Sequence, residues 1–294
     1  MRLLVGGDSE IGAATHRHMR EREGLVVATT RCADRVAPDR PFLDLAAPLD
    51  DWEPPRGTTA ACIFAAVARL AACAADPAGS ARINETQTLD LTERLLRRGV
   101  HVLFLSTNQV FDGNLPHVPA DAPASPVSEY GRQKARTEAA LLRHMDEGAL
   151  LAILRLAKVV SANMPLIHGW MDALAAGRPI RAFHDMTMAP VATPQVACAI
   201  DRILRERARG IFQLTGPRDL TYADVGRFVA RRLDAQPELV HETSAIEAGL
   251  PPGATPRHTT LDSSLLRARF GIEVPDAPTV LDSVVTSGQP KVEN

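Results

Sequence analysis

Cysteine, charge of one sign and long apolar runs are all scarce in this sequence. Its four cysteines lie far apart and form no Cys-x-x-Cys pair, which argues against a zinc site or a disulfide framework and favours a reducing cytoplasm. We therefore expect no bound metal. Among the 294 residues, 33 basic and 35 acidic side chains give a formal net charge of −2. The chain thus lacks the field of one sign that holds nucleic acid or an anionic membrane.

The apolar stretches are short, and the longest of them, residues 60–68 and 150–153, cannot span a bilayer. The first apolar residues run directly into glycines, so we expect neither a signal peptide nor a membrane anchor. Apolar residues make up 45% and charged residues 23% of the chain, as in soluble globular proteins. The composition favours a cytoplasmic protein. A homodimer is the default expectation for soluble enzymes in general.

The first half of the chain alternates short apolar runs with longer helix-forming stretches, which is typical of parallel βαβ units. The fold class predicted is α/β, a doubly wound parallel Rossmann sheet with a smaller C-terminal substrate lobe. The domains are predicted at 1–156 for the sheet, 157–286 for the partly interleaved lobe and 287–294 for a polar tail. The expected strands are 2–6, 25–29, 42–45, 61–65, 100–106 and 150–155, and the expected helices of the first half are 11–22, 81–98 and 127–145.

A glycine-rich turn lies between the first expected strand and the first expected helix. Its spacing is Gly6-x-x-Ser9-x-x-Gly12, with serine where a dinucleotide motif has its middle glycine. Free N–H groups and the dipole at a helix start attract a pyrophosphate, so Gly6, Ser9, Glu10, Ile11 and Gly12 are candidate cofactor-binding residues. The alternative is a plain tight turn.

The end of the second strand bears on the choice of cofactor. A fold that binds NAD places an acid there for the ribose hydroxyls, whereas NADP needs a cation for its 2′-phosphate. Arg31 lies at this point, and no acid follows the strand before Asp34. NADP, as NADPH, is therefore preferred over NAD. The alternative for Arg31 is a solvated surface charge.

A tyrosine and a lysine four residues apart lie on the helix after the fifth expected strand. Residues at this spacing share a helix face, so Tyr130 and Lys134 can point into one cleft. A nearby ammonium stabilises phenolate and lowers the pKa of the phenol, which suits proton exchange near neutral pH. The same pair arises by chance on surface helices, but the chain contains only two tyrosines.

A Ser-Thr-Asn-Gln-Val-Phe-Asp-Gly stretch begins at the carboxyl end of the fifth expected strand, at residues 106–113. The hydroxyl of Thr107 can hydrogen-bond a substrate carbonyl oxygen beside the tyrosine. The alternative is a capped loop that leaves the sheet.

Taken in order, these stretches resemble the extended short-chain dehydrogenase/reductase family, and within it the dTDP-4-dehydrorhamnose reductase group. The resemblance covers nearly the whole chain. It implies that Tyr130 donates the proton, that Lys134 lowers the pKa of Tyr130 and binds the nicotinamide ribose, and that Thr107 orients the carbonyl. The further cofactor-lining residues implied by the resemblance are Asp44, Leu45, Ala65, Ala66 and Val67.

The sequence departs from the group's pattern at three positions on the substrate side. Asn108 and Gln109 replace an acid and a tyrosine, and Lys158 replaces a tryptophan. The leading hypothesis is an NADPH-dependent reductase of a keto group on a nucleotide-linked sugar or a similar polar metabolite. Two alternatives keep the same fold: an epimerase or dehydratase that retains NAD(P), and a non-catalytic dinucleotide-binding regulatory subunit.

Overall fold

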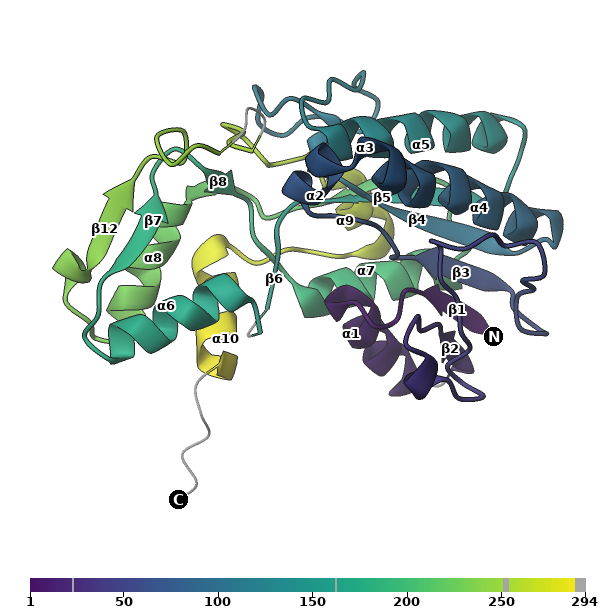
Figure 1. The fold of residues 1–294 in the computed structure, drawn as a ribbon, viewed down its shortest axis with the longest axis horizontal. Helices are drawn as coiled ribbons and strands as arrows, with labels where there is room; N and C mark the ends of the chain where they lie inside the picture. The colour runs from purple at the N-terminus through teal and green to yellow at the C-terminus, as the bar shows by residue number, and fades with distance from the viewer. Residues whose placement is uncertain (23, 162, 251–253, 289–294) are drawn as a thin grey trace.

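The protein is described here by a computed structural model that covers residues 1–22, 24–161, 163–250 and 254–288. Two lobes are visible, a larger one built on a central sheet and a smaller one that carries the C-terminal helix (Figure 1). Most of the predicted polar tail, residues 289–294, lies outside the described residues. Within the described part of the chain, no helix is both long and apolar enough to cross a membrane.

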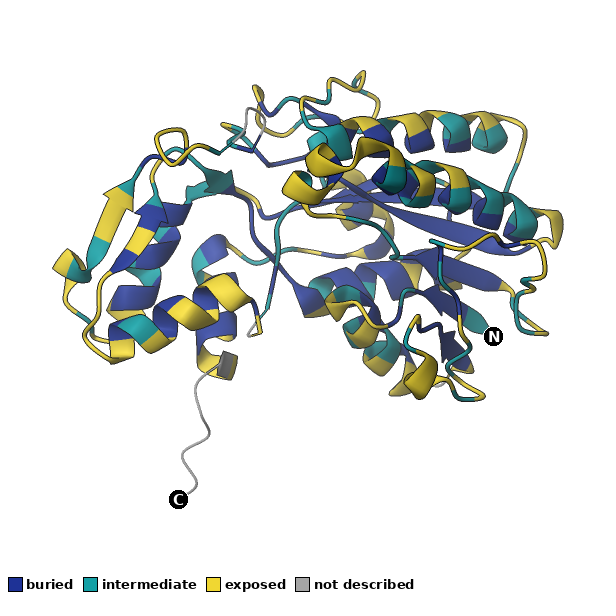
Figure 2. Ribbon diagram, viewed as in Figure 1, coloured by how far each residue is buried: buried dark blue, intermediate teal, exposed yellow. Residues whose placement is uncertain are grey.

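The larger lobe is built around six parallel strands in the order β10-β5-β4-β3-β1-β2. Leu3 of β1 aligns with Val27 of β2 on one side and with Ala61 of β3 on the other. These strands are buried on both faces, which explains why their sequences are continuously apolar (Figure 2). The predicted fold class is confirmed. The strands are β1 (Arg2–Val5), β2 (Val26–Ala28), β3 (Ala60–Ile63), β4 (His101–Thr107), β5 (Leu151–Leu156) and β10 (Gly210–Leu214).

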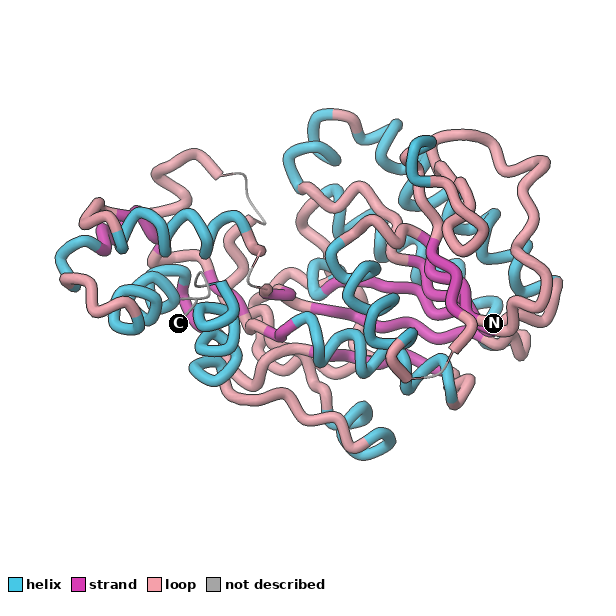
Figure 3. The backbone as a smooth tube through the Cα atoms, turned by 90° about the horizontal axis from the view of Figure 1, so that it is seen from below, coloured by secondary structure: helices cyan, strands magenta, loops and turns pink. Residues whose placement is uncertain are grey.

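Helices cover both faces of this sheet (Figures 1 and 3). One face carries α1, α7 and α9, of which α7 contacts the other two, and the opposite face carries α4 and α5 with the short helices before them. The first group is α1 (Glu10–Arg20), α7 (Thr193–Arg205) and α9 (Ser264–Phe270); the second is α2 (Leu70–Ala75), α3 (Pro77–Ala81), α4 (Thr88–Arg97) and α5 (Glu129–Asp146).

Two expected elements are wrong in detail. Residues 42–45 form no strand, and only a single bridge joins Phe42 to Thr30. Leu43 and Leu45 are buried, which produced the apolar pattern, but Asp44 accepts a hydrogen bond from the Ala46 amide at 2.9 Å and turns the chain away. The expected helix 81–98 is divided, because a π-helical turn (Arg82–Gln87) separates α3 from α4.

The smaller lobe has its own apolar core between helices and three pairs of short strands. Strand β7 pairs with β12 in parallel, β8 pairs with β11 in antiparallel, and β6 pairs with β9 in parallel. Its elements are β6 (Val159–Val160), α6 (Pro165–Ala175), β7 (Ile180–Phe183), β8 (Thr187–Met188), β9 (Val191–Ala192), β11 (Leu220–Thr221), α8 (Tyr222–Arg232), β12 (Val240–Thr243) and α10 (Ala277–Gly288).

The chain passes between the lobes more than once. After β9 it returns to the sheet as α7, which packs on α1, and as β10, which pairs with β5 and which sequence analysis did not identify. It then leaves again through β11 and α8 for the smaller lobe. Parts of residues 157–286 therefore belong to the large sheet, and the junction of the lobes is built from several passes of the chain.

Candidate active site

The first candidate site is a cavity of about 240 Å³ at the carboxyl ends of β1, β2 and β3, which we call the glycine-turn cavity. Ligand sites in doubly wound sheets lie at this edge. Eight of the residues predicted to bind a cofactor line it: Gly6, Ser9, Arg31, Asp44, Leu45, Ala65, Ala66 and Val67. The predictions from four separate stretches thus converge on one cavity.

Two positions of the glycine turn, Gly6 and Gly12, require glycine. Gly6 has a φ of +89°, and a Cβ on Gly12 would lie 2.6 Å from the carbonyl oxygen of Gly6. Ser9 caps α1 by accepting a hydrogen bond from the Gly12 amide at 3.1 Å. Glu10 and Ile11 open the helix, and N–H groups at this position have no acceptor within a helix. The turn therefore presents amides where a dinucleotide phosphate would bind.

An acid that sequence analysis did not identify lies in the same cavity as Arg31. Asp8 lines the glycine-turn cavity, accepts a hydrogen bond from the Thr30 hydroxyl at 2.6 Å, and pairs with Arg40 and, at 3.8 Å, with Arg35. Partial burial raises the pKa of Asp8, but the bonds from Thr30 and Arg40 outweigh it and lower the pKa overall. Its place inside the glycine turn was the available signal, since a side chain there faces the next strand.

The second candidate site, which we call the tyrosine cavity, is also about 240 Å³ and lies where the two lobes meet. From the sheet side it is lined by five predicted residues: Thr107, Asn108, Gln109, Tyr130 and Lys158. From the smaller lobe and the late loops it is lined by residues that sequence analysis missed: Met186, Thr187, Tyr222, Ala254, Pro256 and Thr259. Tyr222 is the only other tyrosine of the chain, which was the one available signal.

Thr107 both caps a turn and lines the tyrosine cavity. It ends β4, and its hydroxyl caps the following 3-10 turn (Asn108–Val110) by accepting a hydrogen bond from the Gln109 amide at 3.2 Å. The capped-loop alternative is thus observed, yet the residue also lines the tyrosine cavity. The cap uses a lone pair of the hydroxyl, whose proton is donated to the side-chain oxygen of Asn108 at 3.5 Å.

The start of α5 is held against this 3-10 turn. Ser128 caps the helix at the Gly131 amide, 3.0 Å away, and donates its own proton to the side chain of Gln109 at 3.0 Å. A Cβ on Gly131 would lie 2.2 Å from the carbonyl oxygen of Gln109, so only glycine permits this approach. Tyr130 is thereby placed in the same cavity as Thr107. Burial raises the pKa of its phenol.

Lys134 lies one turn further along α5, behind the cavity. Its side chain is buried, its ammonium donates a hydrogen bond to the carbonyl oxygen of Leu105 at 2.6 Å, and the nitrogen lies 3.9 Å from the centre of the Phe104 ring. Burial lowers the pKa of Lys134 to about 7, although Glu138 opposes the shift. The expected lowering of the Tyr130 pKa is not observed here, because the ammonium faces the β4 backbone and the burial of the phenol dominates.

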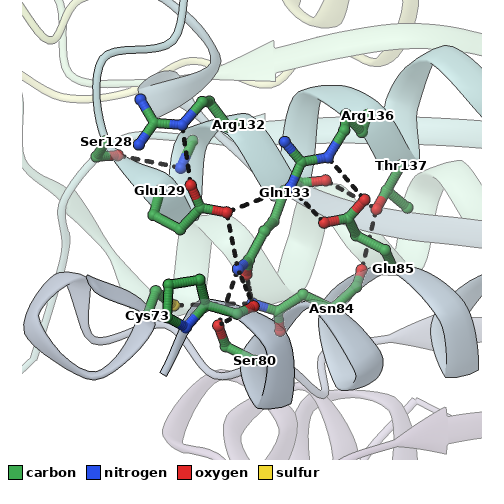
Figure 4. A network of polar contacts seen from close by, with 12 residues as sticks. Cys73, Ser80, Asn84, Glu85, Ser128, Glu129, Arg132, Gln133, Arg136 and Thr137 are labelled. Atoms are coloured by element: carbon green, nitrogen blue, oxygen red, sulfur yellow. Dashed lines mark hydrogen bonds and ion pairs between the residues drawn. The ribbon is translucent and has the colours of Figure 1, made fainter. Parts of the chain in front are cut away.

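A polar network joins α5 to the glycine-turn cavity (Figure 4). Asn84, in the π-helical turn, accepts a hydrogen bond from the Val67 amide at 2.8 Å and donates to the Val67 carbonyl at 3.0 Å and to Gln133 at 2.7 Å. Thr137 donates to the Asn84 carbonyl at 3.0 Å. The two cavities are therefore held in fixed relation, and π-helical turns are frequent at such places.

The loop that forms the far wall of the tyrosine cavity is held by hydrogen bonds to Asp219. Its carboxylate accepts hydrogen bonds from the Thr259 amide at 2.7 Å, the Thr259 hydroxyl at 2.8 Å, the Thr260 hydroxyl at 3.1 Å and the ring of His258 at 3.1 Å. Gly113, with a φ of +73°, lets Pro256 approach, since a Cβ there would lie 2.4 Å from that proline. Among the described residues, no group of three His, Cys, Asp or Glu side chains could hold a metal ion.

Comparison with known proteins agrees with this geometry. Residues 1–289 match the family model described as the RmlD substrate binding domain. A probable low-salt glycan biosynthesis reductase of Haloferax volcanii is 30% identical over 69% of each chain, and a dTDP-4-dehydrorhamnose reductase of Sinorhizobium fredii is 28% identical over 68% of this chain and 71% of that protein. The structure of Thermus thermophilus UDP-glucose 4-epimerase with NAD has the same fold, with a TM-score of 0.82 at 21% identity over 99% of this chain and 100% of that one.

The resemblance stated from the sequence is confirmed, as is the assignment to the NAD(P)-dependent oxidoreductases. The chain belongs to the RmlD substrate binding domain family.

Proposed function

We propose that this protein is an NADPH-dependent reductase of a keto group on a nucleotide-linked sugar. The observation that carries the proposal is the presence of Thr107 and Tyr130 in one cavity, coupled by the Asn84 network to a glycine-turn cavity. The dTDP-4-dehydrorhamnose reductase of S. fredii supports a sugar nucleotide as the substrate class.

The glycine turn and its cavity fit a nicotinamide dinucleotide. The amides of Glu10 and Ile11 at the start of α1 would hold the pyrophosphate, while Asp44 and Leu45 would line the adenine side and Val67 the nicotinamide side. When bound, the dinucleotide supplies the hydride. The chain itself supplies alignment and a proton.

The preference for NADPH rests on the balance of charge beside Arg31. Asp8 lines the glycine-turn cavity together with Arg31, and it is already paired with Arg35 and Arg40. These two guanidinium groups neutralise Asp8, which leaves the charge of Arg31 available to a 2′-phosphate in place of a free ribose hydroxyl.

Tyr130 is the proton donor in this proposal. Because burial raises its pKa, the phenol keeps its proton at neutral pH and can deliver it to a carbonyl oxygen that becomes an alkoxide. The Thr107 hydroxyl, oriented by its cap on the Gln109 amide, donates a second hydrogen bond to the same oxygen. Lys134 supports α5 against β4 and supplies positive charge behind the phenol.

The side chains of Asn108, Gln109 and Lys158 shape the substrate pocket. At two positions where the resemblance implies an acid and a tyrosine, this chain has amides, which offer both donors and acceptors to sugar hydroxyls. Gln109 is oriented by the hydroxyl of Ser128, so the sugar would meet a fixed amide.

The test compares Tyr130→Phe with Tyr222→Phe, because both tyrosines line the same cavity. With NADPH and dTDP-4-dehydrorhamnose or other nucleotide-linked ketosugars, Tyr130→Phe should lower kcat by about 10²- to 10⁴-fold. Tyr222→Phe should change kcat by less than about fivefold, since its hydroxyl, whose pKa burial raises to about 12, is a wall group. Equal turnover of Tyr130→Phe and the parent would remove the proposed proton donor.

A further inference from the structure

We propose that Lys158 makes the tyrosine cavity a subsite for a carboxylate carried by the sugar. The inference deepens the proposed function and rests on it: the preferred substrate is a nucleotide-linked sugar acid, with the keto group at Tyr130 and the carboxylate at Lys158.

The first observation is the charge of the cavity wall. Among the described residues that line the tyrosine cavity, Lys158 is the one with a charged side chain, and the others are apolar or carry hydroxyl or amide groups. Within the described part of the chain, no aspartate or glutamate lines this wall. A sugar bound there therefore meets a single positive charge that the wall does not neutralise.

The second observation is that Lys158 has no ion-pair partner among the described residues. The acid that acts on its charge is Glu10, whose carboxylate is engaged by the Ser161 hydroxyl and lines neither cavity. Burial lowers the pKa of Lys158 despite Glu10. A half-buried ammonium of this kind gains most from a ligand that brings a negative charge.

The third observation is that the lysine is fixed at its backbone. It lies two residues after β5 and directly before β6, and its carbonyl accepts a hydrogen bond from the Val191 amide at 3.0 Å, where β6 begins to pair with β9. The main chain of Lys158 thus belongs to the junction of the two lobes, and its side chain reaches the cavity from a rigid base.

Position favours the sugar over the nucleotide as the source of the negative charge. Lys158 lines the cavity that holds the groups assigned to the reacting carbonyl, whereas it does not line the glycine-turn cavity. Thr107 and Tyr130 occupy the same small space. A charge that meets Lys158 is then one carried by the ring that is being reduced.

The experiment is calorimetry on the whole protein saturated with NADP⁺, titrated with glucose and glucuronate linked to UDP and to dTDP, and with UDP and dTDP alone. The variants are Lys158→Met, which keeps the length of the side chain without its charge, and Lys158→Arg, which keeps the charge. Affinity for NADPH and the unfolding midpoint serve as controls for folding and for the glycine-turn cavity.

The parent and Lys158→Arg should bind the glucuronate form at least tenfold more tightly than the glucose form. In Lys158→Met this ratio should fall to within about twofold of one, with NADPH affinity unchanged. A ratio near one in the parent would overturn the inference. So would an equal loss of affinity for UDP or dTDP alone in Lys158→Met, which assigns the lysine to the nucleotide diphosphate, or a loss of NADPH affinity, which assigns it to the cofactor. Failure of every nucleotide and nucleotide sugar to bind would overturn the proposed function as well.

Discussion

The glycine-turn cavity and the tyrosine cavity have the same volume, about 240 Å³, but walls of different origin. The glycine-turn cavity is lined by residues 5–83, which all belong to the larger lobe. The tyrosine cavity is lined by residues 68–259, and its walls come from both lobes and from the late loops that Asp219 fastens. The glycine-turn cavity is formed by segments close together in the sequence, whereas the tyrosine cavity forms only when segments far apart in the sequence pack together.

This difference separates cofactor binding from substrate choice. The glycine-turn cavity depends on backbone approach at a few glycines, and changes in the smaller lobe should leave it intact. The tyrosine cavity keeps Thr107 and Tyr130 on the sheet side, while the opposite wall carries residues such as Thr187 and Tyr222. Different substrates can therefore be accommodated by the second wall while the groups for chemistry stay in place.

The largest expected effect comes from a substitution that disrupts the glycine-turn cavity alone. In Gly12→Ala the new methyl would lie 2.6 Å from the Gly6 carbonyl, so the turn must shift, and NADPH affinity should fall about 100-fold, equivalent to about 3 kcal/mol. Fluorescence titration with NADPH measures it. Gly169→Ala in α6, where a Cβ meets no atom within 4 Å, is the matched control and should bind as the parent does. Similar affinities for the two variants would contradict the account of the turn.

The next largest effect is expected from a substitution that disrupts the tyrosine cavity and leaves the glycine-turn cavity intact. Asp219→Ala removes the acceptor for His258, Thr259 and Thr260, so the late loop should loosen and KM for the sugar nucleotide should rise about tenfold, with the Kd for NADPH unchanged. Asp172→Ala, which removes an exposed pair with His168, is the control and should alter neither constant. A parallel rise in the NADPH Kd of Asp219→Ala would show that the cavities are not independent.

A smaller effect concerns the choice of cofactor within the glycine-turn cavity. Arg31→Ala should weaken NADPH binding about tenfold, the loss of one charged hydrogen bond, and leave NADH binding nearly unchanged. Asp8→Asn should act in the opposite direction, because it removes the one carboxylate paired with Arg35 and Arg40 beside the site. The measurement is the ratio of NADPH to NADH dissociation constants. If neither variant changes this ratio, Arg31 and Asp8 do not distinguish NADPH from NADH.

The smallest effect is a pH dependence of stability that comes from Lys134. Its pKa is about 7 in the folded protein and near 10.5 when unfolded, so between these values the unfolded chain binds more protons and the free energy of unfolding rises with pH. The slope is at most about 1.4 kcal/mol per pH unit. Lys134→Met should lack this contribution, so its free energy of unfolding relative to the parent should fall steadily from pH 7 to 9. A constant difference in urea melts over this range would show that the lysine does not titrate there.

Sequence analysis predicted the sheet side of both cavities because its residues follow strands within short motifs. Gly6 and Ser9 belong to a motif tied to one turn, and Tyr130 and Lys134 to one helix face. Tyr222, Thr187 and the Asp219 bonds were missed, because they reach the site through tertiary packing that no spacing in the chain encodes. Asp8 was missed for a different reason: its place in the glycine turn could be seen in the sequence, but its pairs with Arg35 and Arg40 could not.

The pKa of Tyr130 also differed from expectation for a physical reason. Helix spacing predicts that Tyr130 and Lys134 point into one cleft, but Lys134 does not line the tyrosine cavity, and its ammonium bonds the Leu105 carbonyl instead. Burial, which depends on the whole fold, then decided the direction of both pKa shifts.

The central claim is that a carbonyl bound beside Tyr130 is reduced at the expense of a dinucleotide in the neighbouring cavity. It is tested most directly with NADPH deuterated at C4 of the nicotinamide, on the face that transfers, and dTDP-4-dehydrorhamnose or the keto form of a nucleotide-linked sugar acid. The account predicts one deuterium at the reduced carbon of the sugar and one NADP⁺ formed for each product molecule. An unlabelled sugar with altered configuration and no net NADPH consumed would contradict it and would identify an epimerase instead.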